Sequence, residues 1–243
     1  MEIRSFQLDS EWNMIHYPER PIGFGILIIG DERNYVDEKT SFWIENEGKY
    51  SLIQKLKEEG YTVFYSNLYR KNWGSRKAVQ LAKRLYEFII RTEIINDKIH
   101  LLAEGMGALV ALQLMGEMGE NIRSAVLINP VLSLKDHLEQ EKEHKFFYKK
   151  LIKELCASYG VEDNQVTKLV NEQETSFPSN IPTKIIHILG GNDSYRESKR
   201  LNQLSVKWKN DAVPVSITYV VPDKMMEMRR EIIRFYRSNE KVL

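Results

Sequence analysis

Cysteine is almost missing from this chain of 243 residues, which contains only Cys156. A single cysteine excludes an internal disulfide and suggests a reducing compartment. We expect its thiol to be a small buried apolar group rather than a reactive one. Histidine is scarce as well, with five residues, and none of the five follows the last apolar run of the chain.

The chain also lacks a long apolar run and an excess of charge of one sign. The longest runs, such as 24–30, are far shorter than the roughly 20 residues that a membrane helix needs. The N-terminus MEIRSFQLDSEW carries acids and has no basic region before an apolar stretch, so it does not resemble a secretory signal. Thirty-five basic and 34 acidic residues give a net charge of +1, which offers no electrostatic footprint for nucleic acid or an anionic membrane. We therefore expect a cytoplasmic protein with neither partner.

Apolar runs alternate along the chain with segments whose apolar residues recur at helical spacing. Six runs rich in β-branched residues are predicted strands: 24–30, 61–68, 98–104, 124–131, 183–191 and 215–221. Their nearly continuous apolar character is typical of strands covered by helices on both faces. The alternation predicts βαβ units and therefore an α/β fold with a mostly parallel central sheet. Ahead of these runs, residues 2–8 and 13–19 predict an antiparallel edge hairpin.

A highly charged segment interrupts this alternation at residues 132–182. It contains KDHLEQEKEHKFFYKKLIKEL, has helical spacing at Phe147, Leu151 and Leu155, and ends in the loop TSFPSNIP. We interpret it as a helical cap that lies over one edge of the sheet. Residues 1–131 and 183–243 then form one core, because a chain of this length does not require two domains.

The corner EGMGALVALQLM is the most informative part of the sequence, because it joins the run 98–104 directly to a helix. At this corner the sequence resembles the α/β-hydrolase family, and the resemblance extends over nearly the whole chain. In that family a nucleophile elbow of the form small-x-nucleophile-x-small joins a central strand to a helix. Here Ala103 and Gly107 take the small positions, and Gly105 takes the position of the nucleophile.

Three further segments resemble loops of the same family. LIIGDERNY resembles the loop that supplies an oxyanion amide, and it places Gly30 and Asp31 there. ILGGND places Asp193 in the loop of the triad acid. YVVPDKMM takes the place of the histidine loop, but it has no histidine and has Lys224 instead. The resemblance thus implies an α/β-hydrolase fold with a degenerate triad.

The residues at these triad positions are not suited to acyl transfer. That reaction needs a nucleophile, a base within hydrogen-bond reach, and an acid that orients the base. Gly105 has no side chain with which to attack, and Lys224 is a poor substitute for an imidazole that titrates near neutrality. Because the members of a triad act as a unit, losing two of them removes most of the rate enhancement. We therefore expect a pseudoenzyme.

Each of these positions also has a purely structural interpretation. Gly105 and Gly107 allow a tight corner with strained or positive φ angles. Asp193 precedes a capping-box pattern at 194–197, and the capping of a helix is enough to explain why this loop is polar. Four carboxylates map to the carboxyl ends of strands, where open α/β sheets bind ligands: Asp31, Glu32, Glu104 and Asp223. Because they lack the spacing of metal ligands, we interpret them as solvated surface groups.

Three functions stay open on the sequence alone. The first is a non-catalytic protein that binds a protein, or holds a small molecule in an elbow pocket, without a cofactor or metal. The pocket residues are then Gly30, Asp31, Glu104, Gly105 and Met106. The second is an esterase-like hydrolase in which Asp193 and a histidine of the insertion, His137 or His144, activate water. For both histidines, however, we expect a position on a solvated helix face. The third is a structural role in an assembly of unknown size.

Overall fold

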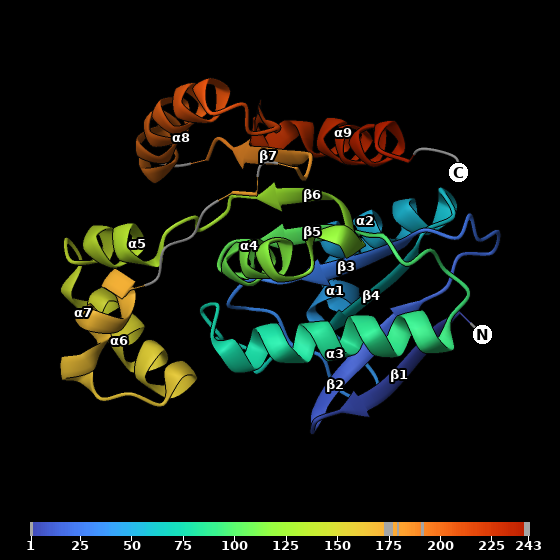
Figure 1. Cartoon of the computed structure of the whole chain (residues 1–243), viewed down its shortest axis with the longest axis horizontal. Coiled ribbons are helices and arrows are strands. Elements are labelled where there is room, and N and C mark those ends of the chain that lie inside the picture. The colour runs from blue at the N-terminus through green and yellow to red at the C-terminus, as the bar shows by residue number, and fades with distance from the viewer. Residues whose placement is uncertain (1, 173–176, 179, 191, 241–243) are drawn as a thin grey trace.

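The computed structural model describes the backbone of residues 2–172, 177–178, 180–190 and 192–240, and their side chains except those of 192–196. Within this part of the chain eight strands form one sheet in the order β1-β2-β4-β3-β5-β6-β7-β8 (Figure 1). The strands are β1 Ile3–Leu8, β2 Glu11–His16, β3 Gly25–Ile29, β4 Thr62–Ser66, β5 Ile99–Glu104, β6 Ile122–Ile128, β7 Thr183–Ile188 and β8 Val215–Val220. The pairs β1–β2 and β2–β4 are antiparallel, and all the other pairs are parallel. The mostly parallel sheet and the N-terminal edge hairpin are both confirmed.

Helices cover both faces of this sheet. Apolar residues of α3, α4 and α8 form one core with the strands, and those of α1, α2 and α9 form a second core on the opposite face. These helices are α1 Phe42–Glu45, α2 Glu47–Glu58, α3 Arg76–Thr92, α4 Gly107–Glu117, α8 Asn192–Asn210 and α9 Met225–Ser238. No helix in the described part of the chain is long and apolar enough to span a bilayer. The predicted α/β fold class, a mostly parallel sheet flanked by helices, is confirmed.

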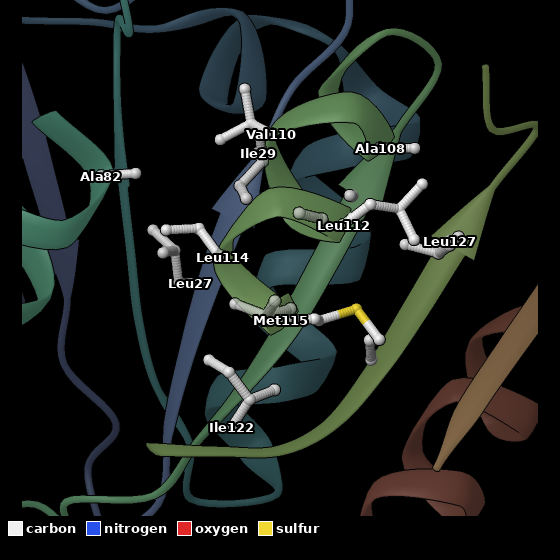
Figure 2. Packing of buried hydrophobic residues seen from close by; sticks show 14 of the residues in the cluster. Leu27, Ile29, Ala82, Ala108, Val110, Leu112, Leu114, Met115, Ile122 and Leu127 are labelled. Atoms are coloured by element: carbon white, nitrogen blue, oxygen red, sulfur yellow. The ribbon is translucent and has the colours of Figure 1, made fainter. Parts of the chain in front are cut away.

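The central strands supply side chains to both cores in turn. In β5, Leu101 and Ala103 join the core of α3 and α4, whereas Leu102 joins the opposite core, as the two-residue period of a strand requires. Every residue of β3 and β4 is buried, which explains why β3 and the centre of β4 are apolar without alternation. Figure 2 shows side chains of α4, among them Leu114 and Met115, packed among those of β3 and β6. This packing fixes the corner before α4 at the centre of the sheet.

The insertion contains α5 Leu134–Glu141, α6 Lys145–Tyr159 and α7 Asp163–Glu172. Its apolar side chains form a third cluster with Trp73, Met106 and Leu109 of the core. Trp73 follows β4 and Met106 follows β5, so the insertion lies beyond the carboxyl ends of the central strands (Figure 1). The edge of the sheet that it covers is the one formed by the carboxyl ends of the strands, at the corner before α4. The division into a core of 1–131 and 183–243 and a cap of 132–182 stays a prediction.

Cys156 lies on α6 and is half-buried beside the third cluster. Its thiol donates a hydrogen bond of 3.2 Å to Asp163. Burial and this neighbouring carboxylate raise the pKa of the thiol. Because the thiolate is the reactive species, the raised pKa makes Cys156 a poor nucleophile at neutral pH, as expected from the sequence.

Candidate functional site

The chain turns sharply between β5 and α4, and two glycines make the turn. Gly105 has a φ of +52°, a left-handed conformation that is strained for any residue with a Cβ atom. Gly107 packs so tightly against β3 that a Cβ there would lie 2.7 Å from the carbonyl oxygen of Gly30. Both glycines therefore have the structural role expected from the sequence. The same corner is the place where the fold resembles a nucleophile elbow.

The carboxylate of Asp31 occupies the space in front of Gly105. Its Oδ1 accepts a hydrogen bond of 3.0 Å from the backbone N–H of Met106. A Cβ built on Gly105 would overlap this carboxylate, whose farther oxygen would be only 2.5 Å away. The amide that follows the elbow residue is thus bonded to an anion of its own chain. The loop after β3 folds over the corner and brings Asp31 to this amide.

A cavity of about 410 Å³ lies in front of the corner, between the core and the insertion. Asp31, Gly105 and Trp73 line it from the core, and His137 and Glu141 line it from α5. None of the described residues that line it carries a hydroxyl or thiol side chain. The elbow pocket predicted from the sequence therefore exists, but its described wall offers carboxylates and imidazoles rather than an oxygen or sulfur nucleophile of the usual kind.

His137 is a cavity residue whose position differs from the solvated helix face expected from the sequence. It is half-buried in the cavity wall, and its ring stacks on Trp73 with centroids 5.3 Å apart. Burial lowers its pKa, although Glu141 and Asp31 act in the opposite direction. The imidazole is therefore neutral at physiological pH and able to accept a proton. The other insertion histidine, His144, is exposed and also lines the cavity.

Ion pairs connect the two sides of the cavity. Lys150 of α6 lies 3.2 Å from Glu32 of the loop after β3 and 3.8 Å from Glu154. Glu154 also accepts a hydrogen bond of 2.9 Å from the indole N–H of Trp73. Partly exposed pairs of this kind contribute about 1 kcal/mol or less each, so their main effect is to orient α6 over the corner. With Asp31 and Glu141 included, carboxylates outnumber the cationic side chains of the cavity.

Three of the predicted pocket residues do not line this cavity. Met106 is fully buried in the third cluster. Glu104 pairs with Lys49 of α2, on the face of the sheet where Leu102 is buried. The sequence could have indicated this position, because Leu102 and Glu104 are two residues apart and such residues of a strand share a face. Gly30 packs against Asn34 and does not reach the cavity wall. Glu104 and Gly30 therefore do not contribute to the wall of this cavity.

Of the two remaining triad positions, only Lys224 has a described side chain, and it does not line the cavity at the corner. Lys224 lies in an exposed 3-10 turn, η2 Pro222–Lys224, and pairs with Glu227 at 3.2 Å. Asp193 belongs to the first turn of α8, and its side chain lies outside the described residues. Because α8 begins at Asn192, the segment 194–197 lies inside the helix and Ser194 is not its N-cap. Among the described residues, no three His, Cys, Asp or Glu side chains converge as a metal site.

Asn129 is a cavity residue that the sequence analysis missed. It directly follows β6, has a φ of +43° and lines the cavity. Its side-chain oxygen accepts a hydrogen bond of 2.8 Å from the backbone N–H of Ile188, which ties the ends of β6 and β7 together. An asparagine at the carboxyl end of a parallel strand was the available signal, because ligands in such sheets bind at these ends.

Comparison with known proteins identifies the fold. No family model matches the chain, and no curated protein sequence matches it either. Solved structures do match: an S-formylglutathione hydrolase from Staphylococcus aureus has a TM-score of 0.63 at 12% identity, covering 96% of this chain and 97% of that chain. Esterase B from Lactobacillus rhamnosis has a TM-score of 0.65 at 13% identity, covering 98% of this chain and 87% of that one. The chain has the α/β-hydrolase fold.

A third structure extends this α/β-hydrolase likeness. An S-formylglutathione hydrolase from Agrobacterium tumefaciens has a TM-score of 0.65 at 9% identity, and the match covers 98% of this chain and 94% of that one. Identities this low show a shared fold, whereas the chemistry depends on the residues of the site. At the α/β-hydrolase elbow of this chain, that site is Gly105 with the carboxylate of Asp31 in front of it.

Proposed function

We propose that this α/β-hydrolase-fold protein is a non-catalytic binding protein that holds a small molecule in the elbow cavity. The observation that carries the proposal is the hydrogen bond from the Met106 N–H to Asp31 in front of Gly105. Ester hydrolysis on this scaffold needs that amide to stabilise a developing oxyanion. A carboxylate already bonded there repels such an anion, and Gly105 supplies no nucleophile.

The cavity wall also indicates what kind of molecule fits. Asp31 and Glu141 expose carboxylate groups to the cavity, and Trp73 contributes an aromatic surface. A ligand with hydrogen-bond donors or a positive charge would pair with these carboxylates and gain from their partial burial. The cavity of about 410 Å³ is within the range typical of small-molecule sites. We therefore propose a small cationic or donor-rich ligand.

A second candidate function is hydrolysis by an activated water. The structural neighbours are named as esterases and S-formylglutathione hydrolases, and these names favour a hydrolase over a binding protein. His137 supports this candidate as well, because a neutral imidazole in the same cavity as Asp31 can remove a proton from water. In this scheme His137 is the general base and Asp31 orients it or the water. The acid expected from the sequence, Asp193, is not needed.

Steady-state hydrolysis of p-nitrophenyl acetate distinguishes the two functions. The binding proposal predicts that the wild-type rate equals that of Asp31→Asn and His137→Phe, with all three close to the uncatalysed rate. A water-activating hydrolase predicts a wild-type rate at least about a hundredfold above that of His137→Phe, the usual contribution of a general base. His144→Phe tests the second insertion histidine, which is exposed and also lines the cavity. A wild-type rate that falls to the uncatalysed level in either histidine variant would refute the non-catalytic proposal.

A further inference from the structure

A second hollow, with a volume of about 510 Å³, lies beside the elbow cavity. It is bounded by the loop after β3, by the segment that runs from β4 into the first turn of α3, and by α6. Cationic side chains from all three elements line it: Arg33, Arg70, Lys71, Lys77 and Lys153. We call this hollow the basic groove. Only Glu32 and Glu154 are acidic among its described lining residues, and both also line the elbow cavity.

The two acids of the basic groove are already paired. Glu32 lies 3.2 Å from Lys150, and Glu154 pairs with Lys71 and with Lys150. No carboxylate of the described residues lies within ion-pair distance of the other four cations, which are Arg33, Arg70, Lys77 and Lys153. The whole chain has a net charge of only +1, so this concentration of unpaired cations is local. A hollow with such walls attracts anions.

The loop that carries Arg70 has an unusual backbone. Leu68, Tyr69 and Arg70 are three consecutive non-glycine residues with φ of +46°, +59° and +57°. Side-chain and backbone hydrogen bonds hold this conformation, among them the bond of 2.8 Å from the Arg70 N–H to the Asn67 carbonyl oxygen. Lys77 is held in turn, with its ammonium group 4.8 Å from the centroid of the Tyr69 ring. Strained backbone persists only where the surrounding structure enforces it, and it concentrates at functional sites.

We propose that the basic groove binds a small polyanion that carries at least two phosphate groups. Guanidinium groups present paired N–H donors that match phosphate oxygens. Arg33 and Arg70 come from two separate loops, and Lys153 comes from the insertion, so the cations lie on different walls of the hollow. An anion with two phosphate groups can contact cations on several of these walls, whereas a single phosphate group can contact only a few of the cations. Because Lys153 belongs to α6, the bound polyanion links the insertion to the core.

Titration calorimetry with inorganic pyrophosphate tests this proposal on the full chain at constant ionic strength. We expect one saturable site, and we expect Arg70→Ala and Lys153→Glu each to weaken binding by about tenfold or more, because each removes a charge-assisted contact. Lys149→Glu is the matched control. It makes the same charge change one turn earlier on α6 at a residue that does not line the groove, and binding should change by less than about threefold.

Three results would overturn the proposal. The first is the absence of saturable heat with millimolar pyrophosphate. The second is equal weakening by Lys149→Glu and Lys153→Glu, which would mean a diffuse field and not a site. The third is orthophosphate binding as tightly as pyrophosphate, which would refute the requirement for two phosphates. Lys153 is exposed and its variants should fold; Arg70→Lys, which keeps the charge but loses the paired donors, covers the case in which Arg70→Ala does not fold.

Discussion

Replacing Gly105 by alanine should destabilise the protein in a way that depends on Asp31. The new Cβ meets the carboxylate of Asp31, which must leave the Met106 N–H. Losing a hydrogen bond to a charged group costs about 1.5–3 kcal/mol, and holding a non-glycine residue at a φ of +52° costs about 1–2 kcal/mol. Gly105→Ala alone should therefore lower the free energy of unfolding by about 2.5–5 kcal/mol.

A double-mutant cycle with Asp31→Ala separates these two contributions. Asp31→Ala already loses the hydrogen bond to Met106, so adding Gly105→Ala should cost only the backbone share, about 1–2 kcal/mol. The two single effects should then exceed the double effect by about 1.5–3 kcal/mol. Urea unfolding monitored by circular dichroism measures all four proteins. Strictly additive effects would refute the contact between the Asp31 carboxylate and the space in front of Gly105.

The remaining predictions concern the elbow, the pH dependence and the insertion. A fluorophosphonate probe should label no serine of the elbow cavity; mass spectrometry checks this, and labelling in the cavity would show a missed nucleophile. Gly105→Ser should stay nearly inactive toward p-nitrophenyl acetate in initial-rate measurements, because its hydroxyl would compete with Asp31 for space. Burial lowers the pKa of His16 from 6.5 to about 4, so the unfolded chain takes up a proton that the folded chain resists. The contribution of this residue to the free energy of unfolding is present above pH 6.5 and should fall by about 3 kcal/mol towards pH 4. Urea titrations of His16→Gln should lack this pH-dependent fall, and a pH profile equal to that of the wild type would contradict the prediction. Leu155→Ala, in the fully buried centre of the third cluster, should lower the free energy of unfolding by about 2–5 kcal/mol, and a loss well below that would mean that the insertion is not packed on the core.

The sheet could be predicted from the sequence because its strands are buried on both faces. A strand covered by helices on each side is apolar on both of its faces, and β3 shows this along its whole length. The corner at Gly105 was equally readable, since two glycines between a strand and a helix indicate a turn too tight for residues with a Cβ atom. These features depend on residues that are close together in the chain.

The composition of the cavity could not be predicted, because it depends on contacts between distant segments. Asp31 and Met106 are 75 residues apart, and they meet only because β3 and β5 are neighbours in the sheet. The position of His137 was partly readable. It lies on α5 three residues after the buried Leu134, and residues three apart are neighbours on the helix surface. What the sequence did not contain was the surface against which that face packs.

A high-resolution crystal structure of the protein purified from cells tests the central claim most directly, through the atom that accepts the hydrogen bond of the Met106 N–H. We predict the Oδ1 of Asp31 in that place, about 3.0 Å from the amide nitrogen, with any additional density lying in the cavity beyond it. An Asp31 side chain turned away, with a water molecule or a product oxygen on the Met106 amide, would contradict the account. It would mean that the oxyanion site is open, and the hydrolase would become the better proposal.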